Sequence, residues 1–354
     1  MLKDKTVFAA MSGGVDSSLA AALLQQQGAN VVGVYMKNWT QDLPGFECPW
    51  KEDLRDAKRV AVKLGIELRV FDFQDQYRQK VVDYMIESYQ AGLTPNPDIM
   101  CNQEITFKIF LDTALEQGAD LIATGHYGRI CRDPASLQTA ANTDKDQTYF
   151  LYRVSEQALA RTLFPIGDFS SKAEVRAKAA SFGLNTAQKK DSQGICFVGK
   201  VGIKDFLKQY VSTQPGLIVD VNGQTVGEHD GAIFYTIGQR HGLGAGGGLP
   251  YYVTHKDMGT NTVYVTNDLS DSSLWNDRVE LRAVHWIGTV PGKDKNYQVR
   301  LRYRGPLVSC SITNDKDLTE LQLVEPQRAI APGQSAVVYD GNQVLGGGVI
   351  TSSP

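Results

Sequence analysis

Short apolar segments alternate with amphipathic segments through the first half of the chain, and this alternation restricts the possible fold more than any other feature of the sequence. Apolar runs bounded by turn residues predict buried strands, and a repeat of about 3.6 residues predicts helices. Strands separated by helices require crossover connections, which place helices on both faces of a parallel sheet. We therefore expect an α/β domain with strands at 6–10, 31–36, 66–71 and 119–124 and helices at 17–27, 52–64, 76–89 and 106–117.

A different pattern begins after this α/β region. Ser171 and Glu174 have the spacing of a capping box, so one more helix is expected to run to Phe182 and to end at Gly183. From about residue 208 short alternating segments follow one another with little helical periodicity, and hairpin turns are predicted at 222–223 and 340–341. The second half is therefore predicted to be rich in β-structure.

The length of 354 residues suits two or three domains. We place a catalytic α/β domain at 1–207, a small β-rich central domain at 208–273 and a C-terminal β domain at 274–354. The division near Ser273 separates two strand-like segments.

Composition limits the class of protein further. The chain is 42% hydrophobic and 21% charged and has no run of about 18 apolar residues, so we expect a soluble cytoplasmic protein without a membrane span. A strand beginning at Thr6 leaves no room for a targeting peptide. The five cysteines show no C-x-x-C pair, which argues against a permanent zinc or iron–sulfur site and allows at most a transient disulfide.

The net charge of -3 is not that of a typical nucleic-acid-binding protein. Arg300, Arg302 and Arg304 alternate with apolar residues, so a continuous strand would place all three on one face. Such a face could bind RNA or could simply be solvated, and the charge pattern alone leaves both interpretations open.

Residues 12–18, with the sequence S-G-G-V-D-S-S, join the first predicted strand to the first predicted helix. Open α/β sheets bind ligands at this edge, and a glycine loop before a helix N-terminus makes an anion site. No lysine follows the glycines, so this is not the loop that holds a transferable γ-phosphate. A simple Ser/Gly turn is the alternative, but the whole motif is similar to the PP-loop of enzymes that adenylate an oxygen, cleaving ATP to AMP and pyrophosphate.

Two other segments are predicted to reach the same edge of the sheet. Met36 ends the second strand and could pack against adenine, although core filling is the commoner role of methionine. Gly125 and His126 follow the fourth strand. An isolated histidine is more often structural, but this position favours a role in the site.

Cys101 and Cys196 lie in two polar segments, P-N-P-D-I-M-C-N at 95–102 and D-S-Q-G-I-C-F at 191–197. The prolines predict a rigid loop around Cys101, just before a helix expected from about Thr106, whose N-terminus could lower the thiol pKa. A single cysteine is usually a buried apolar residue. Two such cysteines beside a PP-loop indicate sulfur chemistry, although their spacing does not show that they meet.

With these segments the sequence resembles the tRNA-specific 2-thiouridylases. The resemblance extends from Ala10 to Gln334 and is carried, in the family's order, by A-M-S-G-G-V-D-S-S, N-P-D-I-M-C-N, A-T-G-H-Y, K-D-Q-T-Y-F-L, D-S-Q-G-I-C-F, Y-T-I-G-Q-R-H-G-L-G and R-A-I-A-P-G-Q. It implies a PP-loop α/β domain with a parallel sheet, a small β-rich middle domain and a C-terminal β-barrel that contacts tRNA.

The resemblance also assigns roles to individual residues. Cys101 would be the nucleophile and Cys196 the persulfide carrier, the two forming a transient disulfide, and Asp98 would be a general acid/base. ATP would be held by Ala10, Met11, Ser12, Gly13, Gly14, Val15, Asp16, Ser17, Met36 and Gly125. The target base would meet Asn96, Pro97 and Asp98, and tRNA would contact His126, Lys145, Asp146, Gln147, Tyr303, Arg304 and Gln334.

The implied reaction is ATP-dependent 2-thiolation of the wobble uridine of tRNAs for Lys, Glu and Gln, releasing AMP and pyrophosphate. ATP would enter with Mg²⁺, and an upstream persulfide donor protein and a final reductant would be required. The persulfide could attack the activated carbon directly, or Cys101 could first release sulfide. Two rivals remain: a PP-loop ligase or amidotransferase that adenylates a small molecule, and a nucleotide-sensing or RNA-binding module without turnover.

Overall fold

The structure is a computed structural model and describes residues 2–42, 47–191, 202–244, 250–315 and 318–352. Its N-terminal part is an α/β domain built on a parallel sheet with the strand order β3-β2-β1-β4-β7. These strands are β1 (Thr6–Ala10), β2 (Asn30–Lys37), β3 (Glu67–Asp72), β4 (Leu121–Ala123) and β7 (Thr162–Leu163). The chain builds outward from β1 through β2 to β3 and then returns to the other side of β1 with β4. The carboxyl ends of β1 and β4 therefore form the topological switch point of the sheet, where α/β folds bind ligands.

Both faces of this sheet are covered, as the alternation of the sequence predicts. In β1, Val7 and Ala9 face one core, while Phe8 and Ala10 face the other. The first core lies under α1 (Val15–Gln26), α2 (Trp50–Leu64) and α8 (Lys172–Ser181). The predicted N-cap of α8 is confirmed, because Ser171 Oγ accepts a hydrogen bond from the Glu174 amide (3.2 Å), while the Glu174 carboxylate accepts from the amide of Ser170 (2.9 Å).

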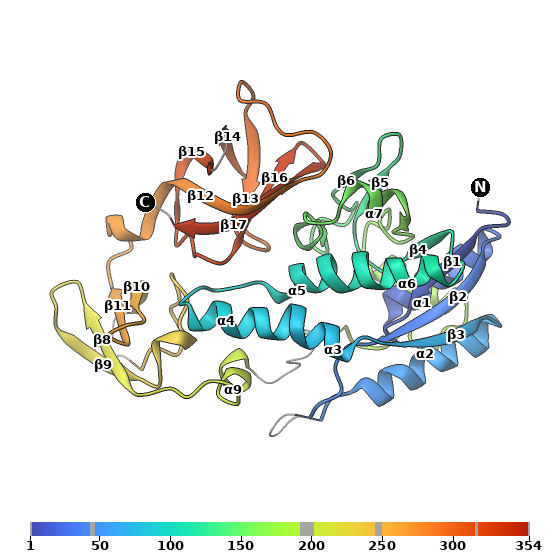
Figure 1. Cartoon of the computed structure of the whole chain (residues 1–354), viewed down its shortest axis with the longest axis horizontal. Helices are drawn as coiled ribbons and strands as arrows, with labels where there is room; N and C mark the ends of the chain where they lie inside the picture. Colours follow the sequence, from blue (N-terminus) through green and yellow to red (C-terminus); the bar gives the residue numbers. More distant parts are fainter. Residues whose placement is uncertain (1, 43–46, 192–201, 245–249, 316–317, 353–354) are drawn as a thin grey trace.

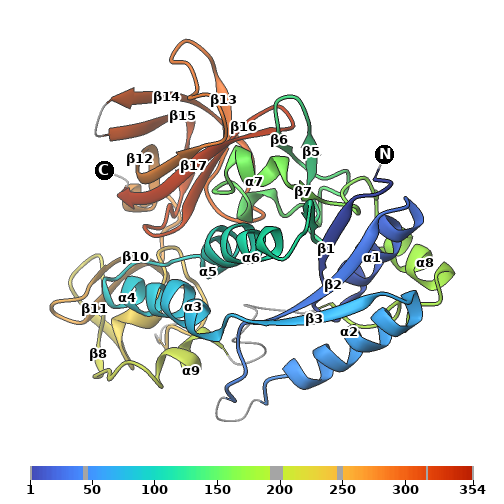
Figure 2. The ribbon, with the colours of Figure 1, turned by 45° about the vertical axis from the view of Figure 1, so that its right-hand side comes forward.

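Two long helices cover the other face and lie side by side across the molecule (Figures 1 and 2). The first runs through α3 (Gln74–Tyr77), the π-helical stretch η1 (Arg78–Asp83) and α4 (Tyr84–Gln90). The second runs through α5 (Pro97–Met100), the π-helical stretch η2 (Cys101–Phe110) and α6 (Leu111–Glu116).

The start of the second long helix corrects a prediction from the sequence. We expected a loop around Cys101 and a helix only from about Thr106, but the helix begins nine residues earlier, at Pro97. The physical reason is that a proline at the first helical position needs no amide partner and already has a helical φ. Cys101 is therefore part of a helix and not of a loop.

The middle region follows α9 (Ile203–Leu207) and holds a four-stranded sheet of order β10-β11-β8-β9. Its strands are β8 (Gly216–Asp220), β9 (Thr225–His229), β10 (Tyr252–Asp257) and β11 (Thr262–Thr266). The turn at 222–223 joins β8 to β9 as predicted, with Gly223 at φ +78°.

The C-terminal strands form a closed six-stranded barrel, because β12 pairs with both β15 and β17. They are β12 (Trp275–Trp286), β13 (Tyr297–Arg300), β14 (Val308–Asp315), β15 (Leu318–Arg328), β16 (Ser335–Asp340) and β17 (Gln343–Ser352). A hairpin of the α/β domain, β5 (Arg129–Cys131) and β6 (Ser136–Gln138), pairs with the start of β17. The remaining short helices are η3 (Thr148–Phe150), α7 (Glu156–Ala160), η4 (Ala232–Phe234) and η5 (Ser272–Leu274).

The predicted stripe of three arginines on one strand face is wrong. β13 ends at Arg300, and the next residues form a turn in which the Gly305 amide donates to the Arg302 carbonyl (2.9 Å). Arg304 itself has φ +58°. This left-handed conformation is incompatible with an extended strand, so the alternation of side chains cannot continue to Arg304. Among the helices of the described ranges, none is long and apolar enough to cross a membrane.

Candidate nucleotide and thiol site

The phosphate loop occupies the switch point of the parallel sheet, between the end of β1 and the start of α1. Gly13 has φ +76°, and a Cβ atom there would lie 2.3 Å from the Asp53 carbonyl oxygen, so only glycine fits. Gly14 is the N-cap residue, and within the described residues no side chain caps this end of α1. The first amide groups of α1 thus remain available to an anion.

Two serines of α1 hold the loop in shape. Ser17 Oγ accepts a hydrogen bond from the Ser12 amide and lies as close to Ser12 Oγ (3.2 Å each). Ser18 is buried and its hydroxyl donates to the Gly14 carbonyl (2.7 Å). The loop is therefore preorganised by its own side chains.

The segment after β4 closes against the same loop, as the sequence predicted. A Cβ atom on Gly125 would lie 2.6 Å from the Ser17 amide nitrogen, so glycine permits this close approach. His126 packs against Phe107 and Phe164, and its Nδ1 contacts Thr124 Oγ1 (2.7 Å). Burial lowers the pKa of His126 to about 4, so its ring is neutral at pH 7.

Met11 and Met36, the two methionines predicted to hold ATP, lie in different surroundings. Met11 is almost fully buried, and its amide donates to the Val34 carbonyl (2.7 Å). Met36 is partly buried at the edge of the core under the long helices. Met36 is therefore the methionine with a side-chain surface left at the carboxyl edge of the sheet.

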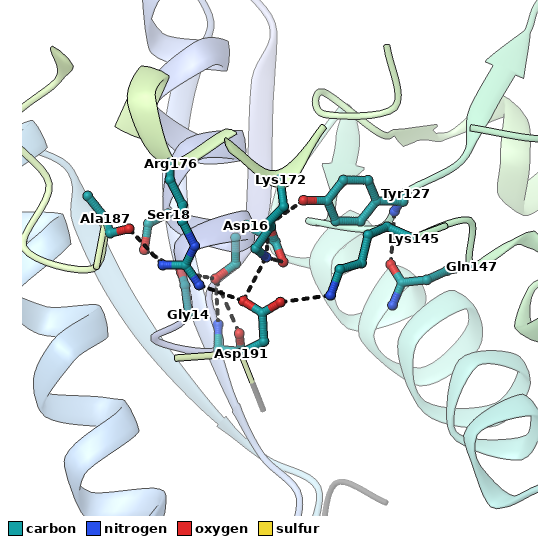
Figure 3. A network of polar contacts seen from close by, with 12 residues as sticks. Gly14, Asp16, Ser18, Tyr127, Lys145, Gln147, Lys172, Arg176, Ala187 and Asp191 are labelled. Carbon is teal, nitrogen blue, oxygen red and sulfur yellow. Dashed lines mark hydrogen bonds and ion pairs between the residues drawn. The ribbon is translucent and has the colours of Figure 1, made fainter. Parts of the chain in front are cut away.

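Asp16 belongs to a network of charges that converges beside the phosphate loop (Figure 3). Lys172 Nζ lies 2.7 Å and 2.9 Å from the two carboxylate oxygens of Asp16 and 2.9 Å from Asp191 Oδ1. Tyr127 donates its hydroxyl to Asp16 Oδ1 (2.9 Å). Asp16 therefore contacts a lysine from α8 and a tyrosine from the loop after β4.

Asp191 is the second carboxylate of this network. It also pairs with Lys145 and Arg176, each at 2.9 Å. Burial opposes its ionisation, but the hydrogen bonds from Lys145 and Lys172 outweigh burial and hold the pKa of Asp191 below its ordinary value. Asp191 is the last described residue before the segment that contains Cys196, which itself lies outside the described residues.

Asp98 and Cys101 lie three residues apart in the second long helix, and this spacing places them on one face. Burial raises the pKa of Asp98 to about 6. This helix leads directly into β4, so its N-terminal end projects beyond the carboxyl edge of the sheet (Figures 1 and 2). That is the edge at which the phosphate loop lies.

Gln334 reaches the chain just before Asn96 and Pro97. Its side-chain amide donates to the Thr94 carbonyl (2.8 Å), and the Thr94 amide donates to the Pro332 carbonyl (2.9 Å). The barrel loop therefore braces the segment predicted to meet the target base.

Three neighbouring residues, Lys145, Asp146 and Gln147, were predicted to contact tRNA. Of these three, only Asp146 is buried. Its carboxylate accepts from the Ala140 amide (2.9 Å) and the Thr148 hydroxyl (2.8 Å) and lies 3.8 Å from Arg300 NH1. Gln147 accepts from the Tyr127 amide (2.9 Å). Asp146 thus connects the α/β domain to the barrel instead of facing solvent.

Tyr303, a predicted tRNA contact, lies at the same interface between the α/β domain and the barrel. Its ring centroid is 4.3 Å from that of Phe150. Arg304 is exposed and stacks on Tyr303, with its guanidinium carbon 5.3 Å from the ring centroid.

Four members of the charge network were not predicted from the sequence to belong to the site. Tyr127 and Asp191 stood inside quoted motifs without an assigned role. Lys172 and Arg176 lie four residues apart on α8, and this spacing of two cations on one helical face was a usable signal. Nothing in the sequence showed that this face meets Asp16.

The parallel sheet with a glycine loop at its switch point defines a nucleotide-binding class of α/β protein. Residues 5–200 match the tRNA methyl transferase HUP domain, residues 204–267 the tRNA methyl transferase PRC-barrel domain and residues 276–350 the aminomethyltransferase beta-barrel domain. The chain is 46% identical over 358 residues to a tRNA-specific 2-thiouridylase MnmA of Methylobacillus flagellatus, covering 99% of both chains. It is also 46% identical over 360 residues to a protein of the same name from Chromohalobacter salexigens, covering 98% of this chain and 92% of that one. The chain belongs to the tRNA-specific 2-thiouridylase family.

Two solved structures are each similar to about half of the chain. The NMN synthetase of Francisella tularensis matches 54% of this chain and 67% of its own, with a TM-score of 0.34 and 16% identity. A predicted subunit of tRNA methyltransferase from Methanocaldococcus jannaschii matches 50% of this chain and 74% of its own, with a TM-score of 0.34 and 19% identity. A TM-score of 0.34 is too low to support a statement about function.

Proposed function

We propose that this chain is a tRNA-uridine 2-sulfurtransferase that uses ATP to activate the uridine and a cysteine persulfide to supply sulfur. The observation that supports the proposal is that an uncapped phosphate loop and the N-terminal end of the helix that holds Asp98 and Cys101 lie at the same edge of the sheet. Full-length relatives named tRNA-specific 2-thiouridylases support the same activity.

The first half-reaction needs the phosphate loop. The 2-carbonyl oxygen of uridine attacks the α-phosphorus of ATP, and pyrophosphate leaves. The oxygen then becomes part of AMP, a far better leaving group than the original carbonyl oxygen. ATP would enter with Mg²⁺, and the free amides at the start of α1 would stabilise negative charge on the phosphates.

The second half-reaction needs two thiols. In one route the terminal sulfur of a Cys196 persulfide attacks C2 of the uridine, AMP leaves, and Cys101 then attacks the Cys196 sulfur to free the thiouridine. In the other route Cys101 attacks the Cys196 sulfur first and releases sulfide, which attacks C2. Both routes end in a Cys101–Cys196 disulfide that an external reductant must open. Both also require a donor protein that loads the persulfide.

Asp98 is suited to moving a proton during these steps. Because burial raises its pKa to about 6, it exchanges a proton much closer to neutral pH than an ordinary aspartate does. We assign it the role of general acid/base beside the target uridine, together with base contacts from Asn96 and Pro97. The proposed targets are the wobble uridines of tRNAs for Lys, Glu and Gln.

The test is to incubate the protein with ATP, a persulfide source and unmodified tRNA and to analyse the nucleosides for 2-thiouridine. We expect Cys101→Ser and Cys196→Ser to abolish the product, and the matched changes Cys48→Ser, Cys131→Ser and Cys310→Ser to leave it. Mass spectrometry should find the stored sulfur on Cys196. Full activity of Cys196→Ser would remove the relay, and ATP cleavage driven by a small amine or acid instead of tRNA would favour a ligase.

A further inference from the structure

The phosphate loop contains no cation of its own, although it is built to bind a polyanion. Residues 12–18 include no lysine or arginine, and they do include Asp16, which carries a negative charge into the first turn of α1. A carboxylate beside bound phosphates would repel them unless its charge were neutralised.

The neutralising charge comes from α8, far along the chain. Lys172 contacts both carboxylate oxygens of Asp16 (2.7 Å and 2.9 Å), and only 17% of its side chain is exposed. Its Nζ also lies 5.7 Å from the centroid of the Tyr127 ring. Figure 3 shows the lysine between the carboxylates of Asp16 and Asp191.

Asp191 keeps the cations of this cluster together. Lys145, Lys172 and Arg176 each contact its carboxylate at 2.9 Å. Among the described residues of the network, two carboxylates therefore face three cations, which leaves one surplus positive charge beside the loop. Without Lys172, the same cluster would have no surplus positive charge, and Asp16 would lose its cation.

We propose that Lys172 is a positioning residue for ATP, which neutralises the charge of Asp16 so that the phosphate loop can accept the polyphosphate. This inference rests on the proposed use of ATP and adds a residue to it. It requires no contact between Lys172 and the nucleotide, because the lysine acts through Asp16.

The experiment measures the equilibrium dissociation constant of Mg²⁺-ATP by calorimetry on the full chain. Lys172→Met should weaken binding by about tenfold or more, because an unneutralised carboxylate then faces the phosphates. Lys172→Gln, which keeps a hydrogen-bond donor but not the charge, should show the same loss. The matched control is Lys178→Met on the same helix, whose ammonium lies over Phe182 and outside the cluster, and it should bind ATP as the wild type does.

The decisive comparison adds Asp16→Asn to Lys172→Met. If Lys172 acts by neutralising Asp16, the double variant should recover most of the lost affinity. Wild-type affinity in Lys172→Gln, or a double variant no tighter than Lys172→Met, would overturn the inference. A wild-type chain that binds no ATP would instead overturn the proposed function, so the two failures are distinguishable.

Discussion

Burial changes the proton affinity of Asp98, and this predicts an effect of pH on stability. Burial raises its pKa to about 6 from the ordinary value of 3.8, so the folded protein binds the proton more tightly than the unfolded chain does. The ionised carboxylate thus costs stability above pH 6, and this cost disappears as the pH falls below 4.

Asp98→Asn should therefore raise the free energy of unfolding at pH 8 by up to about 3 kcal/mol and change it little near pH 4. Denaturant titrations of both proteins at the two pH values measure this. The same variant should lose thiolation, because an amide cannot exchange the proton. Equal effects on stability at both pH values would mean that the carboxylate is solvated.

At the scale of single elements, the loop between β1 and α1 requires glycine at position 13 for two separate reasons. Gly13 combines a left-handed φ of +76° with a close approach to Asp53, whereas Gly65 at the end of α2 has φ +66° and open space around its Cα. Substitutions at Gly13 and Gly65 therefore distinguish the cost of a left-handed backbone from the cost of steric overlap.

Gly65→Ala should cost only the strain of the left-handed conformation, about 1–2 kcal/mol of stability, and should leave ATP binding unchanged. Gly13→Ala should cost more and should also abolish ATP-dependent activity, since the loop must move away from Asp53. Thermal unfolding and ATP titration of both variants check this. A Gly13→Ala protein that keeps wild-type ATP affinity would show that the loop is not the phosphate site.

A helix or strand could be predicted from the sequence where the interactions that form it involve only neighbouring residues. β1 occupies the predicted residues, Thr6–Ala10, because a short apolar run between polar neighbours needs nothing else. The helix at Pro97 was missed because proline was interpreted as a loop residue, although it is favoured at the first position of a helix. Lys172 could not be assigned to Asp16, because 156 residues separate them and only the packed fold brings them together.

Across the whole molecule, the barrel and the α/β domain are joined through buried polar contacts. Tyr149 donates its hydroxyl to the Ser335 carbonyl (2.8 Å), and Arg300 lies against Asp146. Arg302 and Arg304, in contrast, are exposed in the turn after β13. The arginines that the sequence grouped together thus divide into one interface residue and two that remain available to tRNA.

This division predicts two separate phenotypes. Arg302→Ala with Arg304→Ala should weaken tRNA binding and reduce its log–log salt slope by up to about 0.9 per lost phosphate contact, with little effect on stability. Arg300→Ala should lower stability by about 1–3 kcal/mol, because Asp146 would lose its cation in a buried place. Binding curves across a salt series, with melting curves alongside, test both. Superimposable salt curves for the double variant and the wild type would place the tRNA contact elsewhere.

In the proposed reaction the uridine oxygen itself is adenylated before sulfur replaces it. The most direct measurement uses tRNA carrying ¹⁸O at C2 of the target uridine, with ATP, a persulfide source and the full chain, followed by mass spectrometry of both AMP and the nucleosides. We expect one ¹⁸O atom in the AMP for each 2-thiouridine formed. Formation of 2-thiouridine with unlabelled AMP would contradict it, because the oxygen would then have left by another route.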